Sequence, residues 1–240
     1  MIELRRELKQ GPARLAGRVG LPASTIYRIL RRHGLHRLSW MDRPTGRVIR
    51  RIHTDRPGEL VHIDVKKLGR IPDGGGWRTR GRAETRSGRE KRSLGMACVH
   101  SAIDAHTRLA YSEIHDDEKA VTCVAFFDRA QDFFANHGIT NIDAVLTDNA
   151  KNYTGHAFAA ALHGIEHRRI RPWHPQTNGK VERFNRTLLE EWAYVRPYTS
   201  DDERTAALDD WLHLYNHHRH HTAIGGPPIS RINNLPDQYT

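Results

Sequence analysis

Three acidic residues stand at positions where their carboxylates can bind divalent cations together. Asp64 lies in the middle of a strand-like segment at 59–68. Asp148 ends a short apolar strand that begins at residue 144, and Glu182 lies in a polar segment that runs into a helix. Hard carboxylate oxygens suit Mg²⁺ or Mn²⁺, and two such ions about 4 Å apart stabilise both the attacking and the leaving oxygen of a phosphoryl transfer. The pattern therefore predicts a metal site for phosphoryl-transfer chemistry.

The segment around Asp64 alternates its side chains as a β-strand does. One face of residues 59–68 is mainly polar and the other is entirely apolar. The polar face comprises Leu60, His62, Asp64 and Lys66, and the apolar face comprises Val61, Ile63 and Val65. The alternation predicts that the Asp64 carboxylate points away from the apolar side of a sheet.

Glu182 is expected in the first turn of a helix. Asn178 suits the N-cap position, and the helix is predicted to run from there towards Trp192. A carboxylate near the positive end of the helix dipole stays ionised and can ligate a cation, although a Glu at such a place is ordinarily a solvated residue. The basic residues on or beside its polar side, which we expect to hold a polyanion, are Lys180, Arg183 and Arg186.

The segments that carry these acids closely resemble the integrase-core DDE transposases of bacterial insertion sequences, which are relatives of retroviral integrases. The resemblance covers roughly residues 10–240. Its motifs are Gly-Glu-Leu-Val-His-Ile-Asp at 58–64, Leu-Thr-Asp-Asn at 146–149, His-Pro-Gln-Thr-Asn-Gly-Lys-Val-Glu-Arg at 174–183 and Tyr-Asn-His-His at 215–218. Residue 150 is Ala where relatives commonly carry Gly, a departure that affects the loop after Asp148.

The resemblance implies an RNase H-like integrase core, in which a mixed five-stranded sheet is flanked by helices. It also implies metal-dependent DNA cleavage and strand transfer at transposon ends by a multimer. Asp64, Asp148 and Glu182 would be the catalytic residues and the ligands of two Mg²⁺ or Mn²⁺ ions. A catalytically silent, truncated DNA-binding regulator and a nuclease of the same fold are the alternatives.

Composition favours a polyanionic partner. The 240 residues include 38 Lys and Arg against 28 Asp and Glu, a formal net charge of +10. This excess predicts a polyanionic partner, and the basic residues beside the acids favour nucleic acid, which the resemblance implies is double-stranded DNA; the absence of a long apolar run argues against a membrane. Cys98 and Cys123 are too few for a disulfide framework, so we expect a bacterial cytoplasmic protein associated with the nucleoid.

The N-terminal part is predicted to bind DNA through a small all-α helix-turn-helix domain at 1–40. Residues 12–34 have the outline of two helices joined at Gly20, with three-helix packing without DNA contact as the alternative. The outward-facing residues suited to phosphate and major-groove contacts are Ser24, Thr25, Tyr27, Arg28 and Arg31. This domain is short for a complete family member, so we expect an N-terminal truncation.

The remaining chain divides into a basic linker at 41–57 and the catalytic core at 58–235. Within the core, residues 69–92 are rich in Gly and Arg and are predicted to form a flexible basic loop rather than a packed element. Asp104 lies in a turn between two predicted strands, which favours a structural cap over a fourth metal ligand.

Overall fold

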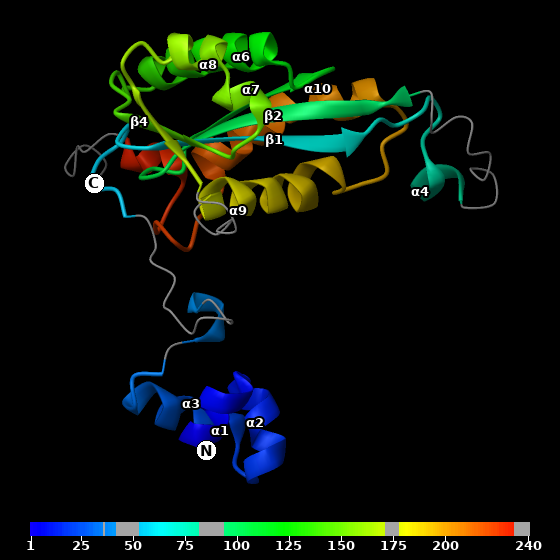
Figure 1. Ribbon diagram of the computed structural model, residues 1–240. Helices are drawn as coiled ribbons and strands as arrows, with labels where there is room; N and C mark the ends of the chain where they lie inside the picture. The colour runs from blue at the N-terminus through cyan, green and yellow to red at the C-terminus, as the bar shows by residue number, and fades with distance from the viewer. Residues whose placement is uncertain (36, 42–52, 82–93, 171–177, 233–240) are drawn as a thin grey trace, which may run out of the picture. The chain divides into compact units, whose positions relative to one another are not determined.

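The computed structural model describes residues 1–35, 37–41, 53–81, 94–170 and 178–232 (Figure 1). Contacts between Cα atoms divide the chain into two compact units, Met1–Ile52 and His53–Thr240. Three predicted segments lie partly outside the described residues. They are the linker at 41–57, the second half of the basic loop at 69–92 and the first four residues of the motif at 174–183. The predicted domain boundaries remain predictions.

The N-terminal unit is all-helical where it is described. Its helices are α1 (Ile2–Leu8), α2 (Pro12–Val19), α3 (Ala23–Arg32) and a 3-10 turn, η1 (Leu38–Trp40). Gly20 joins α2 to α3 with φ +71°, a left-handed conformation that glycine adopts without a Cβ penalty. The buried apolar residues at the centre are Leu15, Ile26 and Leu30.

The second unit is built on a mixed sheet of five strands in the order β3-β2-β1-β4-β5. The strands are β1 (Val61–Gly69), β2 (Met96–Asp104), β3 (Ala110–His115), β4 (Ala144–Thr147) and β5 (Glu166–Arg169). β1 pairs antiparallel with β2 and parallel with β4, and β5 is parallel to β4. This arrangement confirms the mixed five-stranded sheet expected from the sequence.

Helices cover both faces of this sheet. The α-helices of this unit are α4 (Trp77–Arg80), which lies at one end of the sheet, α6 (Ala120–Asn136), α7 (Lys151–Thr154), α8 (His156–Ala161), α9 (Gly179–Leu188) and α10 (Asp201–His213). Short helical segments follow as η4 (Leu189–Ala193), η5 (Leu214–His218) and η6 (Pro228–Arg231), the first two being π-helical. In Figure 1, α6 and α8 lie on one side of β1 and β2, and α9 lies on the other. No helix in the described ranges has the length and apolar character needed to cross a membrane.

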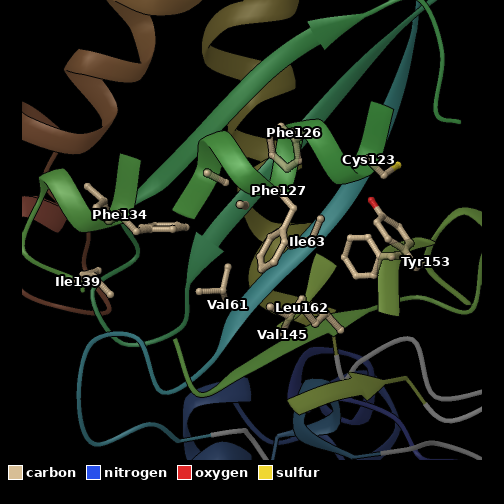
Figure 2. Packing of buried hydrophobic residues seen from close by; sticks show 14 residues of the cluster. Val61, Ile63, Cys123, Phe126, Phe127, Phe134, Ile139, Val145, Tyr153 and Leu162 are labelled. Atoms are coloured by element: carbon tan, nitrogen blue, oxygen red, sulfur yellow. The ribbon is translucent and has the colours of Figure 1, made fainter. Parts of the chain in front are cut away.

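The predicted alternation along β1 sorts its side chains between two buried clusters. Val61 and Ile63 pack against Phe126 and Phe127 of α6, as Figure 2 shows. On the opposite face, Leu68 belongs to a second cluster with the apolar sides of α9 and α10. Full burial of each such side chain contributes roughly 1.5–3 kcal/mol, so both helical layers are held firmly against the central strand. Cys98 and Cys123 are both buried free thiols.

Residues 70–76 of the predicted loop at 69–92 form neither helix nor strand, as predicted, but the expectation that the segment makes no packing contacts is wrong where the structure describes it. Residues 70–81 include α4, and Arg70 forms ion pairs with Asp116 and Asp201. The Thr79 hydroxyl donates to the Tyr198 carbonyl oxygen at 3.4 Å. These contacts could not be predicted from the glycine-rich composition, because they depend on residues far along the chain.

Candidate active site

Asp64 lies near the middle of β1 and is half-buried. Neighbouring residues of β1 face the α6 layer, so Asp64 faces α9 on the other side of the sheet. The Asn185 side chain of α9 donates a hydrogen bond from Nδ2 to Asp64 Oδ2 at 2.8 Å. The central strand and α9 therefore meet at this carboxylate.

Asp148 immediately follows β4, the strand parallel to β1. Val61 pairs with Val145 and His62 with Leu146, and the same register extended by two residues aligns Asp64 with Asp148. Adjacent strands lie about 4.8 Å apart, so the two acids are neighbours across the end of the pairing. Asp148 Oδ1 accepts a hydrogen bond from the Ala150 amide at 2.9 Å, which fixes the turn leading into α7.

The electrostatics of Asp64 show that these acids influence one another. Burial and the nearby charge of Asp148 raise the pKa of Asp64 to about 6, with a smaller effect from Glu182 in the same direction. Like charges brought together disfavour ionisation, and an opposite charge relieves the repulsion. The pair is therefore a place where a bound cation would gain electrostatic energy.

Glu182 lies in the first turn of α9 and is exposed. Burial of Val181, Phe184 and Leu188 fixes the orientation of this helix. Partial desolvation raises the pKa of Glu182. In the part of the chain that the structure describes, no three His, Cys, Asp or Glu side chains are gathered closely enough to hold one metal ion. The structure thus brings Asp64 and Asp148 together and leaves Glu182 beside the pair.

The donor chemistry suits a hard divalent cation. A cation between the two strands would meet the carboxylate oxygens of Asp64 and Asp148, with the amide of Asn185 beside them. Mg²⁺ favours such oxygen ligands. Asn185 Oδ1 is buried and has no hydrogen-bond partner among the described residues. The residues therefore fit the predicted metal, whose number and identity remain predictions.

Asn178 directly precedes α9, as predicted, but its side chain does not cap the helix. Its Oδ1 instead accepts a hydrogen bond from His62 Nδ1 at 2.8 Å, and both residues are buried. Burial lowers the pKa of His62 to about 4, so this imidazole is neutral at pH 7. The predicted N-cap position is therefore confirmed, but the side chain makes no capping bond because it is hydrogen-bonded to His62 on β1.

Sequence reasoning missed Asn185 and gave no role to His62. Two signals were available. Asn185 lies three residues after Glu182, hence on the same side of a helix, and His62 lies on the Asp64 face of β1. Asp104 acts as the predicted cap, because its carboxylate accepts from the backbone amides of Gly58, His106 and Thr107.

The basic residues of α9 have different surroundings. Arg183 and Arg186 are exposed, whereas Lys180 is half-buried, and burial together with the charge of Arg108 lowers its pKa to about 8. In the N-terminal unit, the predicted DNA contacts of α3 are mostly exposed. The exposed ones are Ser24, Tyr27, Arg28 and Arg31, and Thr25 is half-buried. Contact of any of them with DNA stays a prediction.

The fold of the second unit is shared with solved retroviral integrases. The HTLV-2 integrase catalytic core domain, solved in complex with magnesium in a trimeric form, superposes with a TM-score of 0.51 at 15% identity over 73% of this chain and 97% of that one. A simian T-cell lymphotropic virus intasome structure, in complex with PP2A regulatory subunit B56 gamma, gives a TM-score of 0.56 at 18% identity over 98% of this chain and 75% of that one. At this identity, the likeness confirms the RNase H-like fold.

Sequence comparison gives the family. A model described as "Integrase core domain" matches residues 54–175, and a second model of the same description matches residues 163–228. The chain belongs to the integrase core domain family, which confirms the resemblance drawn from its motifs.

Two curated relatives match parts of the chain. An uncharacterized 39.2 kDa protein of insertion element IS476 from Xanthomonas euvesicatoria is 35% identical over 37% of this chain and 26% of its own length. An uncharacterized protein of Caenorhabditis elegans is 30% identical over 52% of this chain and 10% of its own length. The chain thus spans about a quarter and about a tenth of these two relatives.

Proposed function

We propose that this protein is an insertion-sequence transposase that cuts and joins DNA at transposon ends by metal-dependent phosphoryl transfer. The observation that supports the proposal most is the alignment of Asp64 with Asp148 on adjacent parallel strands, where burial and then the charge of Asp148 raise the pKa of Asp64. A purely structural role gives no reason to place two carboxylates side by side and half-buried. The relative from an insertion element agrees with this proposal.

The residues of the chain have separate roles in this proposal. Asp64 and Asp148 present carboxylate oxygens side by side, and Asn185 and the Ala150 amide fix one oxygen of each. Glu182 adds a third carboxylate from α9. Two Mg²⁺ or Mn²⁺ ions held there would polarise the scissile phosphodiester and stabilise negative charge on its oxygens. The reaction is hydrolysis of one DNA strand, followed by attack of the freed 3′-OH on a target strand.

The DNA partner follows from charge. With a formal net charge of +10, the chain attracts a polyanion at long range, and exposed Arg183 and Arg186 lie on the helix that carries Glu182. The predicted helix-turn-helix would recognise the transposon ends through α3. Joining two ends to one target requires two active sites, so we expect a homo-multimer on DNA.

One observation favours the regulator as a second candidate function. No three acidic or histidine side chains in the described ranges are gathered around one point. A chain in which Glu182 never approaches the aspartate pair would bind transposon ends and compete with an active transposase.

A strand-transfer assay distinguishes these functions. Purified protein, Mg²⁺ or Mn²⁺, a labelled duplex carrying the ends that flank this gene and a supercoiled target are incubated together, in parallel with Asp64→Asn and Glu182→Gln. We expect joined products, reduced more than about 100-fold in both variants, since loss of a ligand costs at least as much as loss of a group that orients one. Binding of the ends should persist, because the basic surface is intact.

Glu190→Gln provides the matched control. Glu190 is exposed in η4, on the same helical run as Glu182 and two turns beyond it, and the change neutralises the same charge. It should leave joining unchanged. Tight end binding without cutting by the wild-type protein would support the regulator, and cutting without joining would support a nuclease.

A further inference from the structure

A cavity of about 250 Å³ lies at the far end of β1 from the aspartate pair. The turn that follows β1, the short helix α4 and the segment that follows η4 form its walls. Its main lining residues are Ile71, Trp77, Arg78, Tyr194, Tyr198 and Arg204. In Figure 1, α4 marks this end of the sheet. The proposed cutting and joining chemistry does not use this cavity.

Flat aromatic and guanidinium planes line the cavity. The Arg78 guanidinium carbon lies 4.8 Å from the ring centroid of Trp77 and 4.7 Å from that of Tyr194. On the next part of the wall, Arg196 lies 4.5 Å from the ring centroid of Tyr198. Trp77 and Tyr194 nevertheless remain 39% and 45% exposed, so their rings offer surface to a ligand. Such planes stack on nucleobases of any sequence.

Arg204 has hydrogen-bond donors that no described residue accepts. This side chain is only 2% exposed, and its Nη2 donates to the Gly69 carbonyl oxygen and to Asp201. Its Nε and Nη1 are buried and have no hydrogen-bond partner among the described residues. A buried donor without an acceptor costs roughly 1–3 kcal/mol, so an oxygen acceptor from a ligand would be favourable there.

Charge at the cavity favours an anionic ligand. Three arginines at the cavity form ion pairs with carboxylates. Arg70 pairs with Asp116 and Asp201, Arg196 pairs with Glu203, and Arg204 pairs with Asp201. Arg78 has no ion pair among the residues that the structure describes, and it contacts aromatic rings instead. A phosphate group carries the complementary charge and the acceptor oxygens that this wall lacks.

We propose that the cavity binds one unpaired nucleotide of a DNA strand, whose base stacks on these planes while its oxygens accept from Arg78 and Arg204. The inference rests on the proposed function and adds a DNA contact to it. Along β1, about 16 Å separate Asp64 from the cavity wall at Gly69. Along α9 and η4, about 18 Å separate Glu182 from Tyr194. A single strand leaving the acids can therefore reach the cavity within a few nucleotides.

The test compares binding of two DNAs by the full chain. Fluorescence anisotropy is measured with a blunt duplex and with the same duplex carrying a single-stranded tail of about five nucleotides at either end. We expect tighter binding of one tailed duplex. Tyr194→Ala should weaken that binding about five- to 100-fold, as loss of one base–aromatic stack does, and leave blunt-duplex binding unchanged. Tyr194→Phe, which keeps the ring, should restore the preference.

Arg78→Ala should reduce the same preference, whereas Arg168→Ala, which removes an exposed arginine from β5, should not. Equal binding of tailed and blunt duplexes by the wild-type protein would overturn the inference, as would a Tyr194→Ala variant with unaltered tail preference. If Tyr194→Ala instead changed the oligomeric state alone, a second protein chain would be the occupant and the inference would also fail. Strand transfer by wild type in any of these cases would leave the proposed function standing.

Discussion

Two asparagines hold the start of α9 against β1. Asn178 bonds to His62 and Asn185 bonds to Asp64, so two amides on one side of the helix contact neighbouring positions on the same face of the strand. Each amide satisfies a polar group that the sheet buries or half-buries. Because Glu182 lies between the two asparagines, its place relative to Asp64 depends on both contacts.

Asn178→Ser separates the two roles that residue 178 can have. Serine is as good an N-cap as asparagine, but it is too short to replace the amide at His62. We expect the free energy of unfolding to fall by about 1–3 kcal/mol, because the buried His62 Nδ1–H loses its acceptor. Urea denaturation monitored by circular dichroism measures the change.

The control is the same substitution in a His62→Leu background. There the cost of Asn178→Ser should largely disappear, since the lost bond no longer exists, and the double-mutant cycle gives the coupling energy. Equal stability of Asn178→Ser and wild type would mean that residue 178 acts only at the helix end.

Residue types and spacing single out the three acids as a candidate site, which stays a prediction, whereas the contacts of the two amides cannot be predicted in this way. Alternation in β1 predicts which face of the sheet carries Asp64, but it does not predict which helix packs against that face. Asn178 has two competing uses, and local rules favour the cap because they consider only nearby backbone groups. The choice between them depends on where α9 packs, which the buried Phe184 and Leu188 determine.

At the scale of elements, a polar network joins β3 to α6. Arg129 of α6 donates from Nε and Nη2 to the two carboxylate oxygens of Glu113 at 2.7 and 2.6 Å, and His115 Nε2 lies 2.6 Å from Glu113 Oε2. The Tyr111 hydroxyl also donates to this carboxylate. This network fastens the edge strand to the helix that covers it.

Because of this network, we expect the free energy of unfolding to decrease at acid pH. Burial by itself would raise the pKa of Glu113, but hydrogen bonds from Arg129, Tyr111 and His115 outweigh it and lower the pKa to about 2, against an ordinary value of 4.5. A carboxyl whose folded pKa is depressed stabilises the protein above its unfolded pKa. This stability is lost as the pH falls from about 4.5 to about 2.

Glu113→Gln removes the titrating group. At pH 7 we expect a loss of about 1–2 kcal/mol, moderated because Arg129 is partly exposed. The difference between wild type and variant should shrink as the pH falls through this window, as followed by denaturation at several pH values. Glu166→Gln, which affects an exposed ion pair with Arg168, is the control and should change little. A constant difference at all pH values would contradict the assignment.

Sequence patterns located the elements well, although they did not show how those elements pack. The alternation along β1 is local information of this kind, whereas β5, with the sequence Glu-His-Arg-Arg, has no hydrophobic periodicity. The packing of residues 70–81 depends on Arg70, Thr79 and partners that follow α9, so composition alone could not predict it. The order of strands required the family resemblance, since periodicity does not specify neighbours.

At the scale of the whole molecule, the two units differ in the size of their cores. Among the described residues of the N-terminal unit, the buried apolar centre consists of Leu15, Ile26 and Leu30. The second unit has two extended clusters, one on each face of its sheet. Small cores leave little net stability, so we expect the units to unfold separately and the N-terminal unit to unfold first.

Leu15→Ala tests this separation. The substitution should cost about 2–5 kcal/mol and abolish the lower of two calorimetric transitions without moving the upper one. Phe134→Leu, in the core of the second unit, should lower only the upper transition. A single transition that both substitutions shift together would show that the units unfold as one.

The parallel pairing of β1 with β4 also has a consequence for biosynthesis. Residues 70–143 separate these strands, so their contact is non-local and the chain must close a long loop before it forms. On the ribosome, a nascent chain that carries Asp64 acquires Asp148 and then Glu182 only after β2, β3 and α6 have been made. The three carboxylates of the proposed site are thus all present only after every strand of the sheet has been synthesised.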